Sequence, residues 1–339
     1  MSDRKELLRV RGLQTTFFTD DGEIPAVDNI NFSVREGEIL GIVGESGCGK
    51  SVSALSIMGL VPSPPGKITG GQIEFDGKDL TKLSQKEMRK VRGKDIAMIF
   101  QEPMTSLNPL FTIGNQLMEA ILIHHKDWSK KQARNRAIEM MKLVGLPRAE
   151  ELIKEYPHQL SGGMRQRVMI AMALVCDPKV LIADEPTTAL DVTIQAQILQ
   201  LMKDLNERLN TAVIMITHDL GVVAETCERV VVMYGGQVVE EGPVKLIFND
   251  PQHPYTKGLI QSVPDMRFKK QRLYSIPGNV PKPGSVNTGC RFAARCEFAF
   301  EQCRVENPNL YQTSPEHKTR CFLHERKEVS AVDRAVVES

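Results

Sequence analysis

The chain has 339 residues, of which 41% are hydrophobic and 25% charged, a composition typical of a globular protein with about two domains. Its 43 Lys+Arg and 42 Asp+Glu leave a net charge of +1, so we expect no nucleic-acid partner. No apolar run approaches the length of a membrane span, and the charged start shows no signal peptide. We therefore expect a cytosolic chain that can still dock on a membrane protein.

Short apolar runs predict strands at several places in the chain. They lie at residues 7–10, 31–34, 39–43, 180–183 and 212–216. The last two are continuous and are followed by polar residues, which is typical of buried parallel strands.

Helices are predicted between these strands. The first spans residues 51–60 and ends at the Pro/Gly-rich stretch 62–66, and others lie within 112–145 and 161–176. Alternating strands and helices predict an α/β fold with a largely parallel sheet. From about residue 250 prolines interrupt an irregular segment, and we place a domain boundary there.

A glycine-rich segment follows the run 39–43 and fits the phosphate-binding pattern G-x-x-x-x-G-K-[ST]. It reads Gly44-Glu45-Ser46-Gly47-Cys48-Gly49-Lys50-Ser51. Its backbone N–H groups and the helix N-terminus would hold phosphates, Lys50 would reach the β- and γ-phosphates, and Ser51 would bind Mg²⁺. An incidental glycine turn is the alternative, and the strand–loop–helix context argues against it.

Two further segments carry candidate site residues. The strand from Val180 delivers Asp184 to its carboxyl end, where it can orient Mg²⁺, and Glu185 can polarise an attacking water as general base. Ser161 and Gly163 begin a helix and predict a second anion-binding helix terminus, with an ordinary helix cap as the alternative.

These segments, in this order, resemble the ATP-binding subunits of ABC transporters. The resemblance covers about residues 5–250 and includes the phosphate loop (Walker A), Gln101 (Q-loop), Leu160–Met164 (signature), Val180–Glu185 (Walker B), Ala189–Asp191 (D-loop) and His218 (switch histidine). It implies a P-loop ATPase fold over residues 1–250, with an antiparallel β subdomain and a helical subdomain at about 102–175.

The same resemblance implies roles that the residues alone do not. Phe17 would stack on adenine, Gln101 would contact Mg²⁺ and sense the membrane subunits, and His218 would hold the γ-phosphate, while Asp191 belongs to the nucleotide site. Two such ATPases close head to tail in this family, with each ATP between one phosphate loop and the other signature segment. One motif set therefore predicts a second ATPase subunit.

The segments 101–109, 253–256, 276–278 and 289–296 resemble the peptide/nickel importer subgroup, and most of all its dipeptide-permease D-type ATPases. This implies the ATP-hydrolysing subunit of a dipeptide or oligopeptide importer on the cytoplasmic face of the membrane. Its partners would be a related F-type ATPase, two permease subunits and, indirectly, a solute-binding protein. A nickel or other small-solute importer, a soluble ABC ATPase and a metal-binding regulatory module remain alternatives.

The extension at 251–339 contains four cysteines with the spacing C-x5-C-x6-C-x17-C. They are Cys290, Cys296, Cys303 and Cys321. Four thiolates can hold Zn²⁺ or an iron–sulfur cluster, and the absence of tight C-x2–4-C pairs favours a [4Fe–4S] cluster over zinc. Free buried thiols are the third possibility.

Overall fold

The computed structural model describes residues 4–20, 22–101, 106–188, 190–263, 274–286 and 288–325. Residues 102–105 of the Q-loop segment and Ala189 of the D-loop lie outside the described residues. The chain divides into two compact units. The first consists of Met1–Leu8, Val34–Ile39 and Phe75–Ile216, and the second of Arg9–Ser33, Leu40–Glu74 and Thr217–Ser339.

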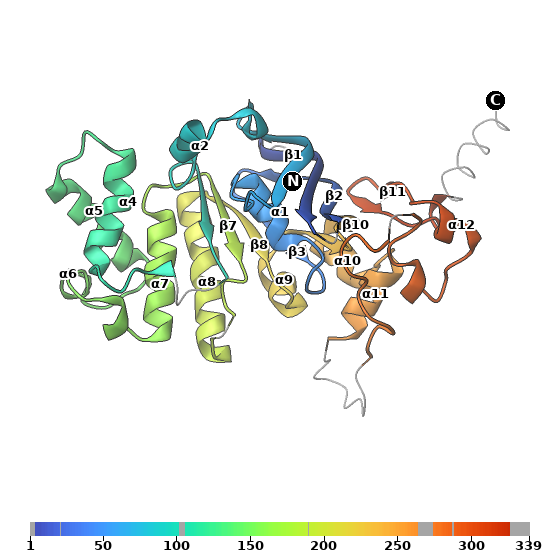
Figure 1. Cartoon of the computed structure of the whole chain (residues 1–339). Coiled ribbons are helices and arrows are strands. Elements are labelled where there is room, and N and C mark those ends of the chain that lie inside the picture. The colour runs from blue at the N-terminus through green and yellow to red at the C-terminus, as the bar shows by residue number, and fades with distance from the viewer. Residues whose placement is uncertain are drawn as a thin grey trace. The chain divides into compact units, whose positions relative to one another are not determined.

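The first unit contains a parallel sheet of three buried strands (Figure 1). These strands are β6 (Ile96–Ile99), β7 (Val180–Asp184) and β8 (Ala212–Ile216). Strand β7 lies between the other two, with Val180 opposite both Ile96 and Ala212. Every residue of β7 and β8 is buried, which explains their continuous apolar sequences.

Helices make up most of the remainder of the first unit. They are α2 (Gln85–Val91), α4 (Ile113–His124), α5 (Lys130–Leu143), α6 (Ala149–Leu152), α7 (Gly162–Leu174) and α8 (Val192–Leu209), and the short strand β5 covers Lys78–Asp79. Helices α4, α5 and α7 pack against one another (Figure 1). Small residues on α5, Ala133 and Ala137, are fully buried and allow a close approach.

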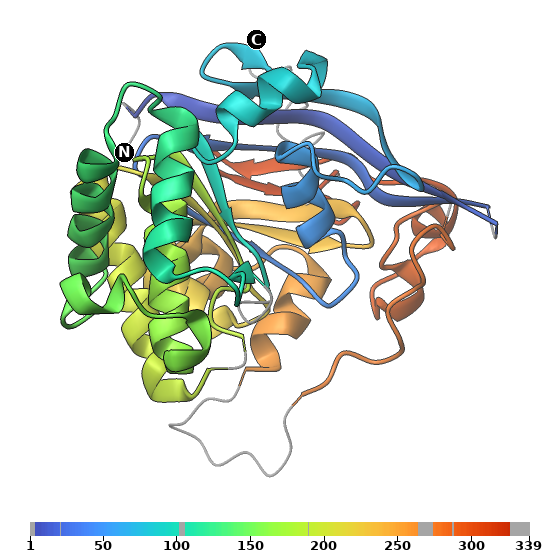
Figure 2. The same ribbon diagram turned by 60° about the vertical axis from the view of Figure 1, so that its left-hand side comes forward.

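The second unit contains most of an antiparallel sheet in which β1 (Glu6–Thr19) lies between β2 (Gly22–Arg35) and β4 (Gly66–Phe75). Figure 2 shows the long strands β1 and β2, in dark blue, side by side. Core positions of both strands, including Leu13 and Ile30, are fully buried. The two predicted strands at 7–10 and 31–34 are therefore parts of two longer strands.

A second sheet in this unit begins at β3 (Ile39–Val43), which pairs in parallel with β9 (Arg229–Tyr234). Strand β9 pairs antiparallel with the next strand, β10 (Gln237–Pro243). Strand β10 in turn pairs with β12 (His317–Thr319), and β12 pairs with β11 (Tyr311–Ser314), both antiparallel. The helices of the unit are α1 (Lys50–Ile57), α9 (Leu220–Thr226), α10 (Val244–Asn249), α11 (Pro254–Gln261) and α12 (Glu301–Val305).

The predicted boundary near residue 250 stays a prediction. The described residues beyond it contain more regular structure than their prolines suggested, including α11, α12, β11 and β12. Strand β12 extends the sheet through β10, with Thr319 opposite Glu240. Three buried aromatic residues pack in one core. They are Tyr234 of β9 and, from the extension, Tyr255 of α11 and Phe292. Their ring centroids are 4.6 to 5.4 Å apart in edge-on or tilted geometry.

Among the described residues, no helix is both long and apolar enough to cross a membrane.

Candidate functional site

The phosphate loop joins β3 to α1 in the second unit. Lys50, the first residue of α1, is buried, and its Nζ donates hydrogen bonds to the carbonyl oxygens of Gly44 at 2.7 Å and Glu45 at 3.2 Å. The ammonium therefore lies over the loop that precedes it. Ser51 follows in the first turn of α1 and is half-buried.

Two glycines of this loop are required by its packing. A Cβ on Gly44 would lie 2.2 Å from the carbonyl oxygen of Met233 on β9, and a Cβ on Gly49 would lie 2.5 Å from that of Ala26. Gly49 also has a φ of 99° at the N-cap of α1, a conformation that L-residues rarely adopt. The loop thus packs closely against the backbone at Met233 and at Ala26, which restricts its conformation.

In the first unit, strand β7 places Asp184 and Glu185 at its carboxyl end. Asp184 is almost fully buried, and Glu185 has a left-handed φ of 49° and donates its N–H to Ile216 of β8. Oε2 of Glu185 accepts hydrogen bonds from Gln101 Nε2 and from Thr188 Oγ1, each at 3.0 Å. The structure therefore brings together two predicted site residues that are 84 positions apart.

The signature segment begins helix α7 in the first unit. Ser161 is the N-cap, and its hydroxyl accepts the N–H of Met164 at 3.3 Å. A Cβ on Gly162 would meet nothing within 4 Å, whereas a Cβ on Gly163 would meet Ile194 of α8 at 3.2 Å. The predicted helix terminus is present. The ordinary capping role that was the alternative is present as well.

The other predicted site residues lie at a helix cap, on a strand and in the loop between β8 and α9. Asp191 is the N-cap of α8 and accepts the N–H of Ile194 at 2.9 Å. Phe17 on β1 is half-buried beside Gly66. His218 is exposed and precedes Asp219, the cap of α9. Phe17, the phosphate loop and His218 belong to the second unit, and the remaining predicted nucleotide-site residues belong to the first.

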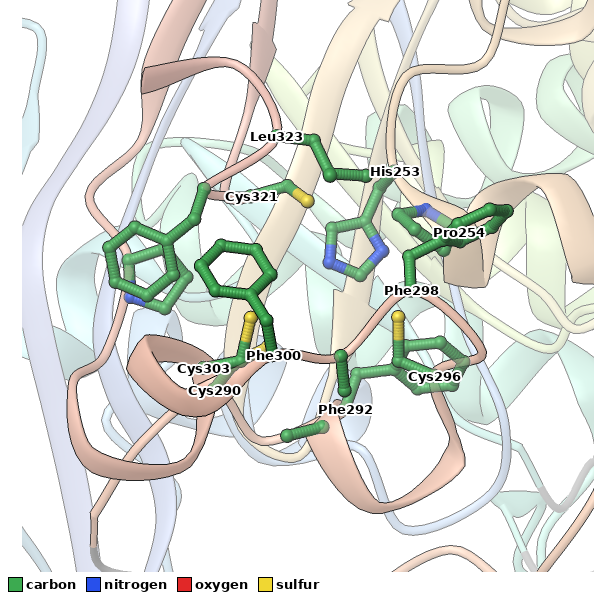
Figure 3. Close-up of a pocket in the computed structure, with 14 residues that line it drawn as sticks. His253, Pro254, Cys290, Phe292, Cys296, Phe298, Phe300, Cys303, Cys321 and Leu323 are labelled. Carbon is green, nitrogen blue, oxygen red and sulfur yellow. The ribbon is translucent and has the colours of Figure 1, made fainter. Parts of the chain in front are cut away.

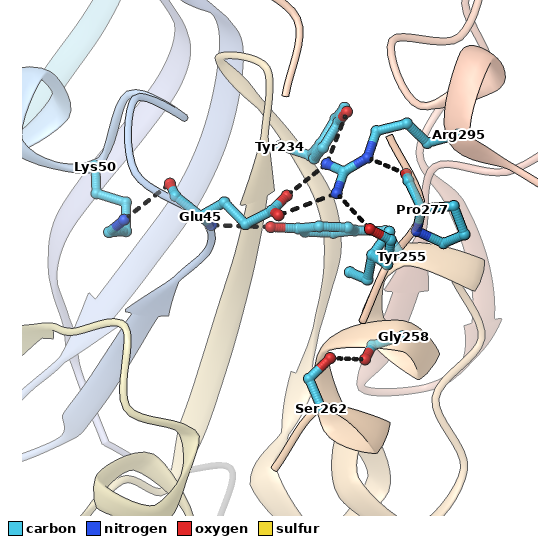
Figure 4. A network of polar contacts seen from close by, with 9 residues as sticks. Glu45, Lys50, Tyr234, Tyr255, Gly258, Ser262, Pro277 and Arg295 are labelled. Atoms are coloured by element: carbon cyan, nitrogen blue, oxygen red, sulfur yellow. Dashed lines mark hydrogen bonds and ion pairs between the residues drawn. The ribbon is translucent and has the colours of Figure 1, made fainter. Parts of the chain in front are cut away.

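Residues of the C-terminal extension contact the phosphate loop directly, a feature the sequence did not predict. Arg295 donates to both carboxylate oxygens of Glu45, at 2.7 and 3.1 Å, and Tyr255 Oη accepts the Glu45 N–H at 2.9 Å (Figure 4). The hydrogen bonds from Arg295 to Glu45 raise the pKa of that guanidinium. The sequence showed Tyr255 and Arg295 only as parts of subgroup motifs, without a role.

A second arginine supports the strands around the loop. Arg291 donates to Asp28 Oδ2 at 2.6 Å and to the carbonyl of Gly235 in the β9–β10 turn. The next residue in that turn, Gly236, donates its N–H to the Cys48 carbonyl of the phosphate loop at 3.0 Å. Arg291 therefore reaches the loop through the turn, whereas Arg295 reaches it directly.

The four C-terminal cysteines line one pocket (Figure 3). Phe292, Phe298, Phe300, Phe322 and His253 are among the other residues that line it. Burial, with a smaller contribution from neighbouring pocket cysteines, raises the pKa of Cys290 and Cys321 to about 11. Among the described residues, no three His, Cys, Asp or Glu side chains are positioned to hold a metal ion.

A buried polar cluster anchors the extension beside this pocket. Glu240 of β10, fully buried, accepts hydrogen bonds from the backbone N–H groups of Gln252 and His253 at 2.6 and 2.9 Å, and its carboxylate lies 2.7 Å from His317 Nε2 on β12. Burial lowers the pKa of His253 to about 4, so this imidazole is neutral at pH 7 and its Nδ1 caps α11 by accepting the Tyr255 N–H.

Comparisons with known proteins agree with this geometry. Residues 27–188 match the family model described as ABC transporter, and residues 239–303 match that of the oligopeptide/dipeptide transporter C-terminal region. The oligopeptide transport ATP-binding protein AppD of Bacillus subtilis is 54% identical over 95% of this chain and 98% of its own. The dipeptide transport ATP-binding protein DppD of Escherichia coli is 50% identical over 93% and 96%.

A solved structure supports the fold. The dimeric ATP-binding cassette MJ0796, in a post-hydrolysis state with ADP and Pi, superposes with a TM-score of 0.63 at 33% identity, covering 70% of this chain and 99% of that chain.

The strand–loop–helix phosphate loop and the Asp-Glu strand end thus define an ATPase of the ABC class. Within that class, the chain belongs to the ATP-hydrolysing subunits of oligopeptide/dipeptide ABC importers.

Proposed function

We propose that the phosphate loop binds the phosphates of ATP through its backbone N–H groups and Lys50. The observation that carries this assignment is the buried Lys50 ammonium, held 2.7 Å from the Gly44 carbonyl in a loop where Gly44 and Gly49 leave no room for a side chain. Such a loop presents N–H groups and positive charge to an anion at a helix N-terminus. Gly44, Ser46, Gly47 and Gly49 would supply this cradle.

We assign Mg²⁺ binding and the activation of water to polar residues of the phosphate loop, the Q-loop and the Walker B strand. Ser51, Asp184 and Gln101 are the proposed ligands of Mg²⁺, which neutralises phosphate charge during hydrolysis. Glu185 would accept the proton of the attacking water, and two hydrogen-bond donors orient its carboxylate. His218 would contact the γ-phosphate and Phe17 would stack on the adenine.

The partners are also inferred. The solved relative MJ0796 is dimeric, which supports a second ATPase subunit for this chain, of the F-type in our proposal, with Ser161, Gly163 and Asp191 facing that subunit's nucleotide. We further infer two permease subunits and a position on the cytoplasmic face of the membrane. Dipeptides or oligopeptides are the proposed solutes, because the named relatives AppD and DppD carry these descriptions.

Nucleotide binding by the purified full-length chain tests the central assignment. We expect Lys50→Ala to weaken MgATP binding by about tenfold or more, because it removes a charge-assisted contact to phosphate. The matched control is Lys245→Ala on α10, an exposed lysine outside the loop. Unchanged binding by Lys50→Ala would show that the loop does not hold ATP.

We also propose that the four-cysteine pocket holds a [4Fe–4S] cluster. Four thiols and four phenylalanines share one pocket, yet no three ligands among the described residues are placed for a single ion. The sequence spacing of these cysteines, which has no tight C-x2–4-C pair, favours a cluster over zinc. The plainest role is to hold the extension together.

Metal analysis of anaerobically purified protein tests the pocket. We expect iron and acid-labile sulfide in equal amounts, with loss of both in Cys303→Ser and retention in Cys227→Ser, a cysteine outside the pocket. Zinc without sulfide would identify a zinc site. If neither metal is found, the pocket holds four free, half-buried thiols.

A further inference from the structure

The carboxylate of Glu45 lies inside a loop that is proposed to bind a polyanion. Arg295 holds it with a two-pronged contact, Nη1 to Oε2 at 2.7 Å and Nη2 to Oε1 at 3.1 Å. The Arg295 side chain is only 5% exposed, while that of Glu45 is 28% exposed. Without this arginine the loop would present a negative charge next to the triphosphate.

The guanidinium is itself fixed in place. Its Nε donates to the Pro277 carbonyl at 2.9 Å, and it lies over the rings of Tyr234 and Phe292 at 5.8 and 6.0 Å from their centroids. Figure 4 shows Arg295 bridging from Pro277 to Glu45 beside Tyr234. A contact built from a rigid arginine loses little entropy when it forms, so it can hold the loop firmly.

The backbone of Glu45 is held from the same side. Tyr255, fully buried on α11, accepts the Glu45 N–H at 2.9 Å, and the Glu45 carbonyl accepts Lys50 Nζ at 3.2 Å. The N–H, carbonyl and carboxylate of one loop residue therefore all have fixed partners, two of them more than 200 positions away.

We propose that Arg295 and Tyr255 of the C-terminal segment are positioning residues for the phosphate loop, and that Arg295 also neutralises Glu45 so that the loop can accept ATP. The inference rests on the proposed phosphate binding by this loop. It assigns part of the affinity for ATP to residues that lie outside all of the ABC ATPase motifs.

Four variants of the full-length chain, each measured for the MgATP dissociation constant, test the proposal. Arg295→Gln should weaken binding about tenfold, since it leaves an uncompensated carboxylate beside the phosphates. Glu45→Gln should have a smaller effect, and the double variant should recover most of the affinity lost in Arg295→Gln. Tyr255→Phe should weaken binding about threefold by removing the acceptor of the Glu45 N–H.

The recovery in the double variant distinguishes this proposal from a purely structural role, which would make two substitutions at least as harmful as one. Arg304→Gln, an exposed arginine on α12, is the matched control and should bind as the wild type. Wild-type affinity in Arg295→Gln, or a double variant as weak as Arg295→Gln, would overturn the proposal. Lys50→Ala in the same assay separates this proposal from the phosphate-loop assignment. If the Arg295 proposal fails but Lys50→Ala binds MgATP weakly, the phosphate-loop assignment stands. If Lys50→Ala also binds normally, that assignment is wrong as well.

Discussion

The side-chain amide of Gln101 donates a 3.0 Å hydrogen bond to Glu185, the proposed general base, on the oxygen that Thr188 also contacts. The backbone of Glu185 also donates its N–H to Ile216, and its left-handed φ of 49° comes directly after the last residue of strand β7. A residue of the Q-loop therefore orients the group that would activate water. Movement of Gln101 would alter hydrolysis without any change in the phosphate loop.

The first prediction concerns Glu185 itself. Glu185→Gln should retain MgATP binding and lose turnover by about 100-fold or more, because the amide cannot accept the proton of the attacking water. Glu207→Gln, on the exposed side of α8, is the control. Steady-state phosphate release and nucleotide binding, measured on the same preparations, check this. Wild-type turnover in Glu185→Gln would remove the assignment.

The second prediction concerns the hydrogen bond to Glu185. Gln101→Ala should reduce turnover by about three- to tenfold while the carboxylate stays present, as expected for the loss of one orienting hydrogen bond. Gln200→Ala, which removes a solvent-exposed contact to Asp204 on α8, should leave turnover unchanged. An effect of Gln101→Ala as large as that of Glu185→Gln would mean that loss of the proposed Mg²⁺ ligand, and not only of the hydrogen bond to Glu185, limits turnover.

The third prediction uses two glycines with opposite surroundings. Gly44→Ala should lower the thermal unfolding midpoint and cost about 2 kcal/mol or more, since its methyl would overlap the Met233 carbonyl. Gly162→Ala at the start of α7 has open space and should be neutral or slightly stabilising. Equal stability of the two variants, followed by thermal unfolding, would contradict the packing described for the loop.

The fourth prediction is a pH dependence set by His253. Burial lowers the pKa of this imidazole to about 4, below its unfolded value of 6.5, so at intermediate pH the unfolded chain takes up a proton that the folded chain does not. The free energy of unfolding should therefore fall as the pH drops from about 6.5 to about 4, by about 3 kcal/mol at most. The charge of Glu240 and a backbone hydrogen bond from Arg320 oppose this lowering of the His253 pKa, while the charges of His324 and Arg320 add to it.

His253→Asn provides the test, because asparagine can still cap α11 but does not titrate. Denaturant unfolding at several pH values should show a shallower acid dependence for this variant than for the wild type. His158→Asn, an exposed histidine of the first unit, should keep the wild-type slope. Identical slopes for His253→Asn and the wild type would assign the acid sensitivity to other groups.

The elements whose sequence patterns are strong were predicted well. Strand β8 has the predicted limits and β7 exceeds its prediction by one residue, Asp184, because unbroken apolar runs between polar residues leave little choice. The 112–145 pattern resolves into α4 and α5, each begun by a Thr or Ser cap. The strands β1 and β2 were underestimated, since their polar positions alternate with buried ones and extend well beyond the apolar runs.

The site was predicted unevenly for a different reason. Motif residues such as Lys50 and Glu185 stand in a recognised order along the chain, so the sequence pattern alone predicts roles for them. The contacts of Arg295 and Tyr255 with Glu45 link positions at least 210 apart, and nothing in the local sequence of any of the three indicates the others. Only the folded chain shows that the extension reaches the loop.

The stretch from Cys290 to Cys296 has two sides with different neighbours. Cys290, Phe292, Ala293 and Cys296 line the thiol pocket, whereas Arg291 and Arg295 point to Asp28 and Glu45. One short piece of backbone thus carries both pocket cysteines and the arginines that contact Asp28 and the phosphate loop. A substitution of Cys290 or Cys296 would disturb the neighbouring arginines, so such variants should be tested for nucleotide binding as well as for metal content.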